Sequence, residues 1–357
     1  MDEVGQQLAG LLAKDSGSRL AAPPDEHLQT AAVQHGVALL LQHQQAVPGT
    51  SKDNLWVTYY REQVLSSQVQ YKAVLTLCSQ LKQHGIRFIV LKGWALSATL
   101  YNRMYLRPKT DIDLLIHPQD KARSLALFQT NGFHNPRGWQ PAYIIDQISM
   151  CKPLLGAIRL NVDVHFELTN DKGLQPLFEV ESLIEKGDYI SGLGAHIICR
   201  PMAFIHCVIH LLHHQASGDF IKLIWYYDMH LLINAMSTTE TKQLYTEIEK
   251  MQISRLVAKV TATLVNLFPS QAADALLEAA RQLPARSEFD YLLAEPSLNA
   301  ATFRQLRYTR GWAAKLGVAK EGLFPPRAEI EKKYGQSDWP LVMLYIRRII
   351  TGIKKRL

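Results

Sequence analysis

The chain has 357 residues, which is enough for about two domains of ordinary size. Apolar residues make up 47% and charged residues 20%, so the composition is that of a folded globular protein and excludes a disordered chain. The four cysteines include no Cys-x-x-Cys pair, which argues against a zinc knuckle or a disulfide framework. The 39 basic and 32 acidic residues leave a net charge of +7, compatible with a phosphate-bearing partner but not diagnostic of one.

The first residues contain acids where a secretory signal would contain positive charge, and their apolar run is short. The sequence has no stretch of eighteen apolar residues that could span a bilayer. We therefore expect a cytoplasmic protein without a membrane span.

Hydrophobic periodicity predicts an N-terminal helical segment followed by a small α/β domain. The helices of the first segment are expected at Asp25–Gln45 and Asn54–His84. The strands of the second part are expected at Arg87–Leu91, Thr110–Ile116, Ala142–Met150 and Ile158–Leu168, with a hairpin at Tyr189–Cys199. Helices that begin at Trp94 and Pro118 follow the first two strands, and Lys152-Pro153 with Gly156 marks the turn between the next two.

From Pro201 onward the apolar spacing is helical almost throughout. Helices are expected at Met202–Gln215, Phe220–Ala235, Thr239–Leu267 and Gln271–Leu283. A final amphipathic segment, Trp339–Leu357, would either dock on the other helices or lie on a membrane surface. The predicted organisation is a helical segment at 1–84, an α/β domain at 85–200 and a helical domain at 201–357.

Two aspartates stand two positions apart on the second predicted strand. Side chains alternate along a strand, so Asp111 and Asp113 share one face while Ile112 and Leu114 occupy the other. Neighbouring carboxylates repel unless a cation lies between them or one is protonated. Mg²⁺ or Mn²⁺ would supply that cation, although a D-x-D triplet also occurs by chance at solvated strand edges.

The same alternation places Asn161, Asp163 and His165 on one face of the strand at Ile158–Leu168. A third carboxylate on a nearby strand is what a two-metal phosphoryl or nucleotidyl transfer site needs. We therefore predict that Asp111, Asp113 and Asp163 are the catalytic metal ligands.

Candidate phosphate-binding residues lie between the first and second predicted strands. Gly93 permits close approach of a phosphate to the backbone at the start of a helix, and Lys92 adds positive charge; an ordinary strand-to-helix turn would look the same. Arg107 and Lys109 lie four and two positions before Asp111 and could hold a triphosphate. A solvated pair of loop residues is the alternative.

These motifs resemble the nucleotidyltransferase family of the DNA polymerase β-like superfamily. The resemblance rests on Gly85-Ile86-Arg87-Phe88-Ile89-Val90-Leu91-Lys92-Gly93, Leu100-Tyr101, Arg107, Asp111-Ile112-Asp113-Leu114-Leu115-Ile116 and Val162-Asp163-Val164-His165. It continues in the histidine-rich stretch His206–His214 and in Trp225–Asp228. One departure is that the superfamily's Gly-Gly or Gly-Ser pair is missing, since Gly93 is followed by Trp94 and lies eighteen positions before Asp111.

The resemblance implies an α+β fold, with a mixed sheet in a polymerase β-like catalytic domain at 85–200, N-terminal helices and a C-terminal helical domain. It implies Mg²⁺- or Mn²⁺-dependent transfer of a nucleoside monophosphate, ordinarily AMP from ATP, to a hydroxyl or phosphate of a small-molecule, peptide or protein acceptor, with release of pyrophosphate. An inactive nucleotide-binding or protein-interaction module and an enzyme that extends nucleic-acid 3′ ends are the alternatives. A nucleic-acid partner is not expected, because no recognisable binding motif is present.

The helical part contributes further candidates. His206, His210 and His213 have the spacing of one helix face and could bind zinc, line the cleft or pack in the core. Lys222 could contact phosphate. Trp225 or Tyr226 could stack on a base, with core packing as the alternative, and Asp228 could contact substrate or be an N-terminal-turn partner of those histidines. Candidates to line the cleft also include His165, Tyr226 and Asp228. Residues 298–357 hold 13 Lys or Arg against 4 Asp or Glu, which makes this basic end the expected place for an acidic partner.

Overall fold

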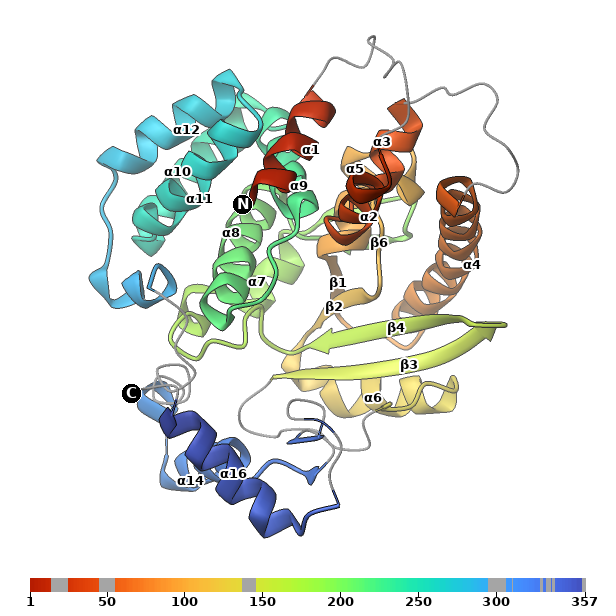
Figure 1. Ribbon diagram of the computed structural model, residues 1–357, viewed down its shortest axis with the longest axis vertical. Helices are drawn as coiled ribbons and strands as arrows, with labels where there is room; N and C mark the ends of the chain where they lie inside the picture. Colours follow the sequence, from red (N-terminus) through yellow and green to blue (C-terminus); the bar gives the residue numbers. More distant parts are fainter. Residues whose placement is uncertain are drawn as a thin grey trace.

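The computed structural model describes residues 1–13, 25–44, 55–136, 146–294, 306–309, 311–327, 330–331, 335 and 338–354. It is an α+β protein in which helices surround one mixed sheet (Figure 1). Within these described ranges, every helix is too short or too polar to cross a membrane.

The sheet has six strands in the order β3-β4-β2-β1-β6-β5. The strands are β1 Phe88–Leu91, β2 Ile112–Ile116, β3 Gln147–Leu155, β4 Ile158–His165, β5 Asp188–Ile190 and β6 Ala195–Ile197. The central strand β2 runs antiparallel to β1 and parallel to β4. All residues of β1 and β2 are buried, which explains why their sequences are almost entirely apolar.

Helices cover the sheet and extend beyond it. They are α1 Glu3–Ala13, α2 Glu26–Gln34, α3 Ala38–Gln44, α4 Leu55–Gln83, α5 Lys92–Leu100, α6 Lys121–Thr130, α7 Val180–Glu185, α8 Arg200–Ser217, α9 Leu223–Asn234, α10 Thr238–Met251, α11 Ser254–Leu267, α12 Gln271–Gln282, α14 Trp312–Leu323 and α16 Leu341–Lys354.

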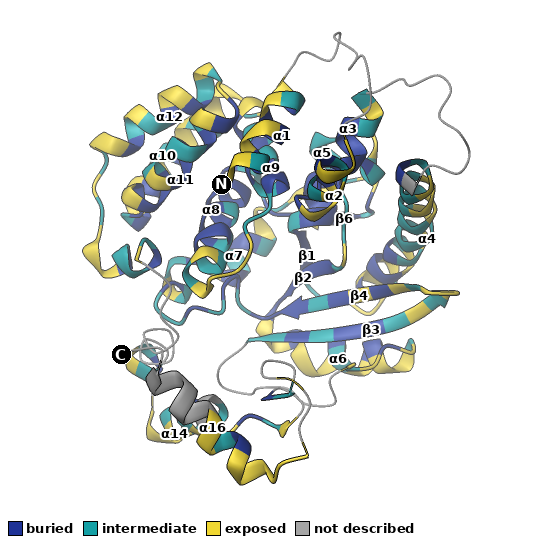
Figure 2. Ribbon diagram, in the orientation of Figure 1, coloured by how far each residue is buried: buried dark blue, intermediate teal, exposed yellow. Residues whose placement is uncertain are grey.

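Two hydrophobic cores lie on opposite faces of the sheet. One core joins α4 to the face that carries Val90 and Leu114. The other contains Leu91 and Leu115 and unites the N-terminal helices with α8 to α12. Figure 2 shows the buried strands in the middle and the exposed outer sides of α10 and α12. The functional site lies on the second face, and the domain boundaries at 84 and 200 stay a prediction.

Two predicted helices are each divided in the structure. The helix expected at Asp25–Gln45 is split into α2 and α3 at Gly36, whose φ of +73° favours glycine. The helix expected at Thr239–Leu267 is split into α10 and α11 at Gln252, whose φ is +54°. Gln252 is the C-cap residue of α10, and its carbonyl accepts a hydrogen bond from the Arg286 N–H at 2.8 Å rather than from a residue of a continuing helix. Arg286 is distant in the sequence, so this contact was not visible in the local pattern.

Other element boundaries also differ. The expected turn at Lys152-Pro153 is part of β3, which continues to Leu155; proline is tolerated there because β3 is an edge strand. Helix α5 begins at Lys92, directly after β1, rather than at Trp94. Positions 142–145 of the expected third strand and positions 355–357 of the basic end lie outside the described residues.

Candidate functional site

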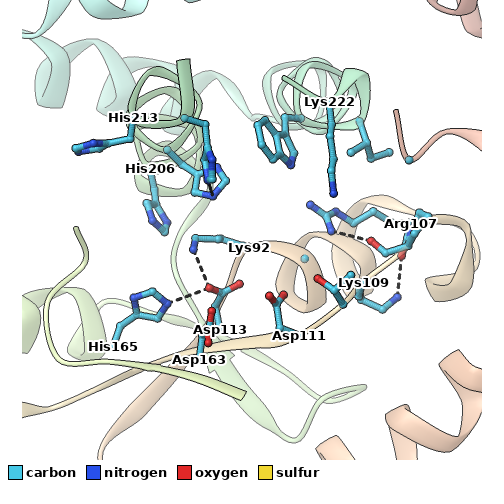
Figure 3. Close-up of a pocket in the computed structure, with 18 of the residues that line it drawn as sticks. Lys92, Arg107, Lys109, Asp111, Asp113, Asp163, His165, His206, His213 and Lys222 are labelled. Carbon is cyan, nitrogen blue, oxygen red and sulfur yellow. Dashed lines mark hydrogen bonds and ion pairs between the residues drawn. The ribbon is translucent and has the colours of Figure 1, made fainter. Parts of the chain in front are cut away.

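The register of the two parallel strands brings the carboxylates together. Asp113 of β2 lies opposite Asp163 of β4, so both side chains project from the same face of the sheet. Figure 3 shows them with Asp111, which directly precedes β2. Among the described residues, Asp113, Asp163 and His165 form a cluster of potential metal ligands, and their ligand atoms lie within 4.8 Å of one another. His165, predicted only to line the cleft, is therefore part of the cluster.

Asp113 has two basic partners. Its Oδ1 accepts a hydrogen bond from Lys92 Nζ at 2.7 Å and lies 2.9 Å from His165 Nε2. Burial would raise the pKa of the Asp113 carboxyl, but Lys92 and His165 hold it well below its usual range. Asp113 is thus an ionised, buried carboxylate whose charge is balanced by a side-chain ammonium.

Asp111 differs from its neighbour because it makes no hydrogen bond or ion pair with the described part of the chain. Burial and repulsion from Asp113 and Asp163 raise the pKa of Asp111 to about 6. Asp163 accepts a hydrogen bond from Ser149 Oγ at 2.7 Å. An unpartnered carboxylate beside two others is an arrangement that a bound cation would relieve, and these oxygen donors fit a hard divalent ion.

Lys92 and Gly93 form the junction between β1 and α5. Lys92 has a φ of +47°, a conformation that costs a non-glycine residue about 1 kcal/mol or more. A Cβ on Gly93 would lie 2.7 Å from Arg107 Nη1. Gly93 lines the pocket, and its lack of a side chain also makes room for the Arg107 guanidinium.

Arg107 is held by the helical part of the chain. Its Nε and Nη2 donate to Oδ2 of Asp228 at 3.1 and 2.8 Å, and Nη1 donates to the Pro108 carbonyl. Tyr101 donates its hydroxyl to the same carboxylate at 2.7 Å. Asp228, predicted to line the cleft, is buried away from the pocket. Its role in the structure is to fix Arg107.

Lys109 is also engaged by protein atoms. Its Nζ donates to the carbonyls of Met104 and Arg107 and lies 4.7 Å from the centre of the Trp94 ring. Burial and the nearby Arg107 charge lower the pKa of Lys109 to about 7. Lys109 lines the pocket, but its ammonium already has three neighbours in the fold.

Helix α8 forms the opposite wall with four histidines, of which Figure 3 labels His206 and His213. Burial lowers the pKa of His206 to about 3 and that of His210 well below its usual value, so both imidazoles are neutral at pH 7. His210 Nε2 lies 3.2 Å from His214 Nε2. Among the described residues, no group of three ligands forms around these histidines, so they line the pocket without composing a zinc site of the predicted kind.

Helix α9 contributes Lys222 and Trp225. The side chain of Lys222 extends from the start of α9 toward Arg107 (Figure 3), and its ammonium has no hydrogen bond or ion pair with the described residues. The Trp225 ring lies 5.1 Å from that of His210. Tyr226, the other predicted stacking residue, is buried in the core and does not line the pocket.

All these walls enclose a cavity of about 700 Å³, a volume that suits a small-molecule ligand. Val33 and Gly36, from the N-terminal helices, line it as well. The sequence interpretation did not predict that the N-terminal helices line the pocket. One feature could have indicated it, namely Gly36, a glycine within an otherwise helical pattern.

The sequence of residues 22–269 matches the uncharacterised nucleotidyltransferase family. Among solved structures, the fold is similar to an antigenic nucleotidyltransferase-like protein from Paracoccidioides brasiliensis, with 16% identity, a TM-score of 0.42 and coverage of 62% of this chain and 96% of that one. No curated protein matches the sequence. The family match covers well over half of the chain and includes the three carboxylates and the histidines of α8. The chain therefore belongs to the uncharacterised nucleotidyltransferase family.

Proposed function

We propose that this protein is a metal-dependent nucleotidyltransferase. It transfers a nucleoside monophosphate, with AMP from ATP as the expected case, to a hydroxyl or phosphate of a small-molecule, peptide or protein acceptor and releases pyrophosphate. The observation that supports this most directly is the in-register pair Asp113 and Asp163 beside Asp111 in a large pocket. Membership of a nucleotidyltransferase family supports the reaction class.

Asp111, Asp113 and Asp163 would hold Mg²⁺ or Mn²⁺. When bound, such ions neutralise phosphate charge and lower the pKa of an attacking hydroxyl. Asp111 is available for this role because it has no protein partner among the described residues. His165 contacts Oδ1 of Asp113 and so fixes the orientation of that carboxylate.

The remaining charge of the triphosphate requires cations. Lys222 is the pocket lysine whose ammonium has no partner in the described chain, and Lys92 is adjacent to the carboxylates. We propose that these two lysines bind phosphate oxygens. Arg107 and Lys109 also line the pocket and add positive charge to it, but their N–H groups are engaged by Asp228 and by backbone carbonyls.

The experiment is incubation of the purified protein with Mg²⁺, each of the four NTPs and fractions of a cell extract. Mass spectrometry should find an acceptor that gains one nucleoside monophosphate, with pyrophosphate released in equal amount. Asp111→Asn should abolish the product. Asp188→Asn, an exposed aspartate on β5 outside the pocket, should leave it unchanged.

Other outcomes identify the alternatives. Tight NTP binding without turnover on any acceptor would favour a nucleotide-binding module. Addition of nucleotides to an RNA or DNA 3′ end, with binding that weakens steeply as salt rises, would favour a nucleic-acid enzyme.

We also propose that the basic end, residues 298–357, binds an acidic partner and that the protein acts in the cytoplasm. Within the described part of this end, Lys320 and Arg347 are exposed, and so are apolar side chains such as Trp312 and Val342. Affinity for an acidic partner should therefore fall as ionic strength rises.

A further inference from the structure

The pocket has two chemically different ends. In Figure 3, His213 and His165 lie at one end and Lys222 and Arg107 at the other, with the carboxylates between them. An elongated ligand that reaches the carboxylates can therefore extend in either of two directions, and the side chains at each end determine which part of a ligand fits there.

The turn between α2 and α3 belongs to the Lys222 end, because it packs on the first turn of α9. The Leu223 N–H donates to His35 Nδ1 at 3.2 Å, and the Ile224 N–H donates to the His35 carbonyl at 3.1 Å. A Cβ on Gly36 would lie 3.0 Å from Ile224 Cγ2. His35 thus accepts hydrogen bonds from two N–H groups at the N-terminus of α9 that have no acceptor within the helix. Because these N–H groups are used, a phosphate at this end of the pocket would have to bind the Lys222 ammonium.

Next to Lys222, at the start of α9, the pocket wall is apolar and aromatic. Val33 is 38% exposed and Ile224 is 3% exposed, and both border the pocket together with Trp225. The Trp225 ring is supported by His210 and His214, with ring centres at 5.1 and 4.9 Å. An apolar and aromatic surface and one ammonium thus stand next to each other on the first turn of α9, in the same pocket as the carboxylates. A nucleotide likewise joins a base to a triphosphate whose oxygens bind metal.

The other end is lined by uncharged polar side chains around His213, whose Nε2 lies 3.7 Å from Oδ2 of the buried Asp171. Asn170 Nδ2 donates to Gln147 Oε1 at 3.2 Å, and Thr169 Oγ1 lies 3.4 Å from His213 Nε2. These amides and hydroxyls line the pocket and can exchange hydrogen bonds with hydroxyl groups, which both donate and accept. They offer no counter-charge to a strongly charged molecule.

We propose that Val33, Ile224 and Trp225 form the nucleobase subsite and that the end around Gln147, Thr169 and Asn170 receives a neutral, hydroxyl-bearing acceptor. This inference rests on the proposed function and adds the direction in which the two substrates lie. It gives the N-terminal helices a direct part in nucleotide recognition.

Binding measurements separate base recognition from phosphate recognition. Isothermal titration in Mg²⁺ would compare ATP, GTP, CTP and UTP with inorganic tripolyphosphate, which lacks a base. Val33→Asn, which adds polarity without charge, should weaken the best-bound NTP about tenfold and leave tripolyphosphate affinity unchanged. Lys222→Met should weaken both ligands. Leu65→Asn, an equally polar change at a 53% exposed leucine of α4 outside the pocket, is the matched control and should change neither.

Gln147→Met tests the opposite end. It should leave NTP affinity unchanged and raise the KM of the acceptor identified by mass shift. The inference is overturned if Val33→Asn binds the NTP as wild type does, or if Gln147→Met weakens NTP binding as much as Val33→Asn is expected to. Failure of the wild-type protein to bind any NTP would instead overturn the proposed function, and the subsite with it.

Discussion

The ammonium of Lys92 lies 2.7 Å from Oδ1 of Asp113, the same oxygen that contacts His165 Nε2 at 2.9 Å. A side-chain cation therefore already balances the most deeply buried of the three carboxylates, beside the unpartnered Asp111. A divalent ion that bound Oδ1 of Asp113 would compete with Lys92 for this oxygen, and the released ammonium would become available to a phosphate.

Lys92→Met should therefore change metal and nucleotide binding in opposite directions. Loss of the competing ammonium should tighten Mn²⁺ binding about tenfold, equivalent to about 1.4 kcal/mol, while NTP affinity falls because a phosphate contact is lost. Isothermal titration with Mn²⁺ alone and then with NTP checks both. Lys72→Met, at an exposed lysine of α4, is the control. Weaker Mn²⁺ binding in Lys92→Met would contradict the competition.

The ion pair between Arg107 and Asp228 should be a major determinant of stability. Both side chains are buried, and removal of one partner leaves an uncompensated charge, so Asp228→Asn should lower the free energy of unfolding by about 3 to 5 kcal/mol. Urea denaturation measures this. Glu278→Gln, in an exposed pair with Arg281, should cost less than about 1 kcal/mol. If both variants lost the same small amount of unfolding free energy, the ion pair with Asp228 would not be what holds Arg107.

His206 should make the folded state sensitive to acid. Its pKa is about 3 in the fold against 6.5 for the ordinary side chain, so below pH 6.5 the unfolded chain binds a proton that the folded chain excludes. This group therefore lowers the unfolding free energy by about 1.4 kcal/mol per pH unit between pH 6.5 and pH 3. His206→Gln should reduce that slope in urea titrations at pH 7.5, 5.5 and 4.5. An unchanged slope would place a charged or solvated imidazole at this position.

The strands and the carboxylate face could be predicted from the sequence, because both depend on local alternation. Ile112 and Leu114 are buried in the core against α4, while Asp111 and Asp113 line the pocket on the other face. The apolar sequence of β1 likewise indicated a buried strand, and Phe88–Leu91 forms one.

Contacts between distant residues could not be predicted. Arg107 and Asp228 are separated by 121 positions, and each, taken alone, looked like a substrate-binding side chain. The same holds for the α2–α3 turn, because its packing on α9, which brings it to the pocket, joins residues that are far apart in the sequence. Periodicity describes which face of an element is buried but does not identify its partner.

Gly36→Ala should link this turn to nucleotide binding. Alanine is strained at a φ of +73°, and its Cβ would press on Ile224. Gly132→Ala provides the matched control, because Gly132 has a φ of +80° but open space around it. The strained backbone should cost both variants about 1 kcal/mol of unfolding free energy, Gly36→Ala should lose more because of the contact with Ile224, and only Gly36→Ala should weaken NTP binding. Equal NTP affinity in the two variants would separate the turn from the nucleotide site.

The most direct test of the central claim follows the fate of labelled ATP, or of whichever NTP binds best, with the identified acceptor and Mg²⁺. Label at the α-phosphate should appear on the acceptor, and label at the γ-phosphate should appear in pyrophosphate. Asp113→Asn should abolish both signals, and Asp188→Asn should retain them. Transfer of the γ-label to the acceptor, or undiminished α-label transfer by Asp113→Asn, would contradict carboxylate-dependent nucleotidyl transfer.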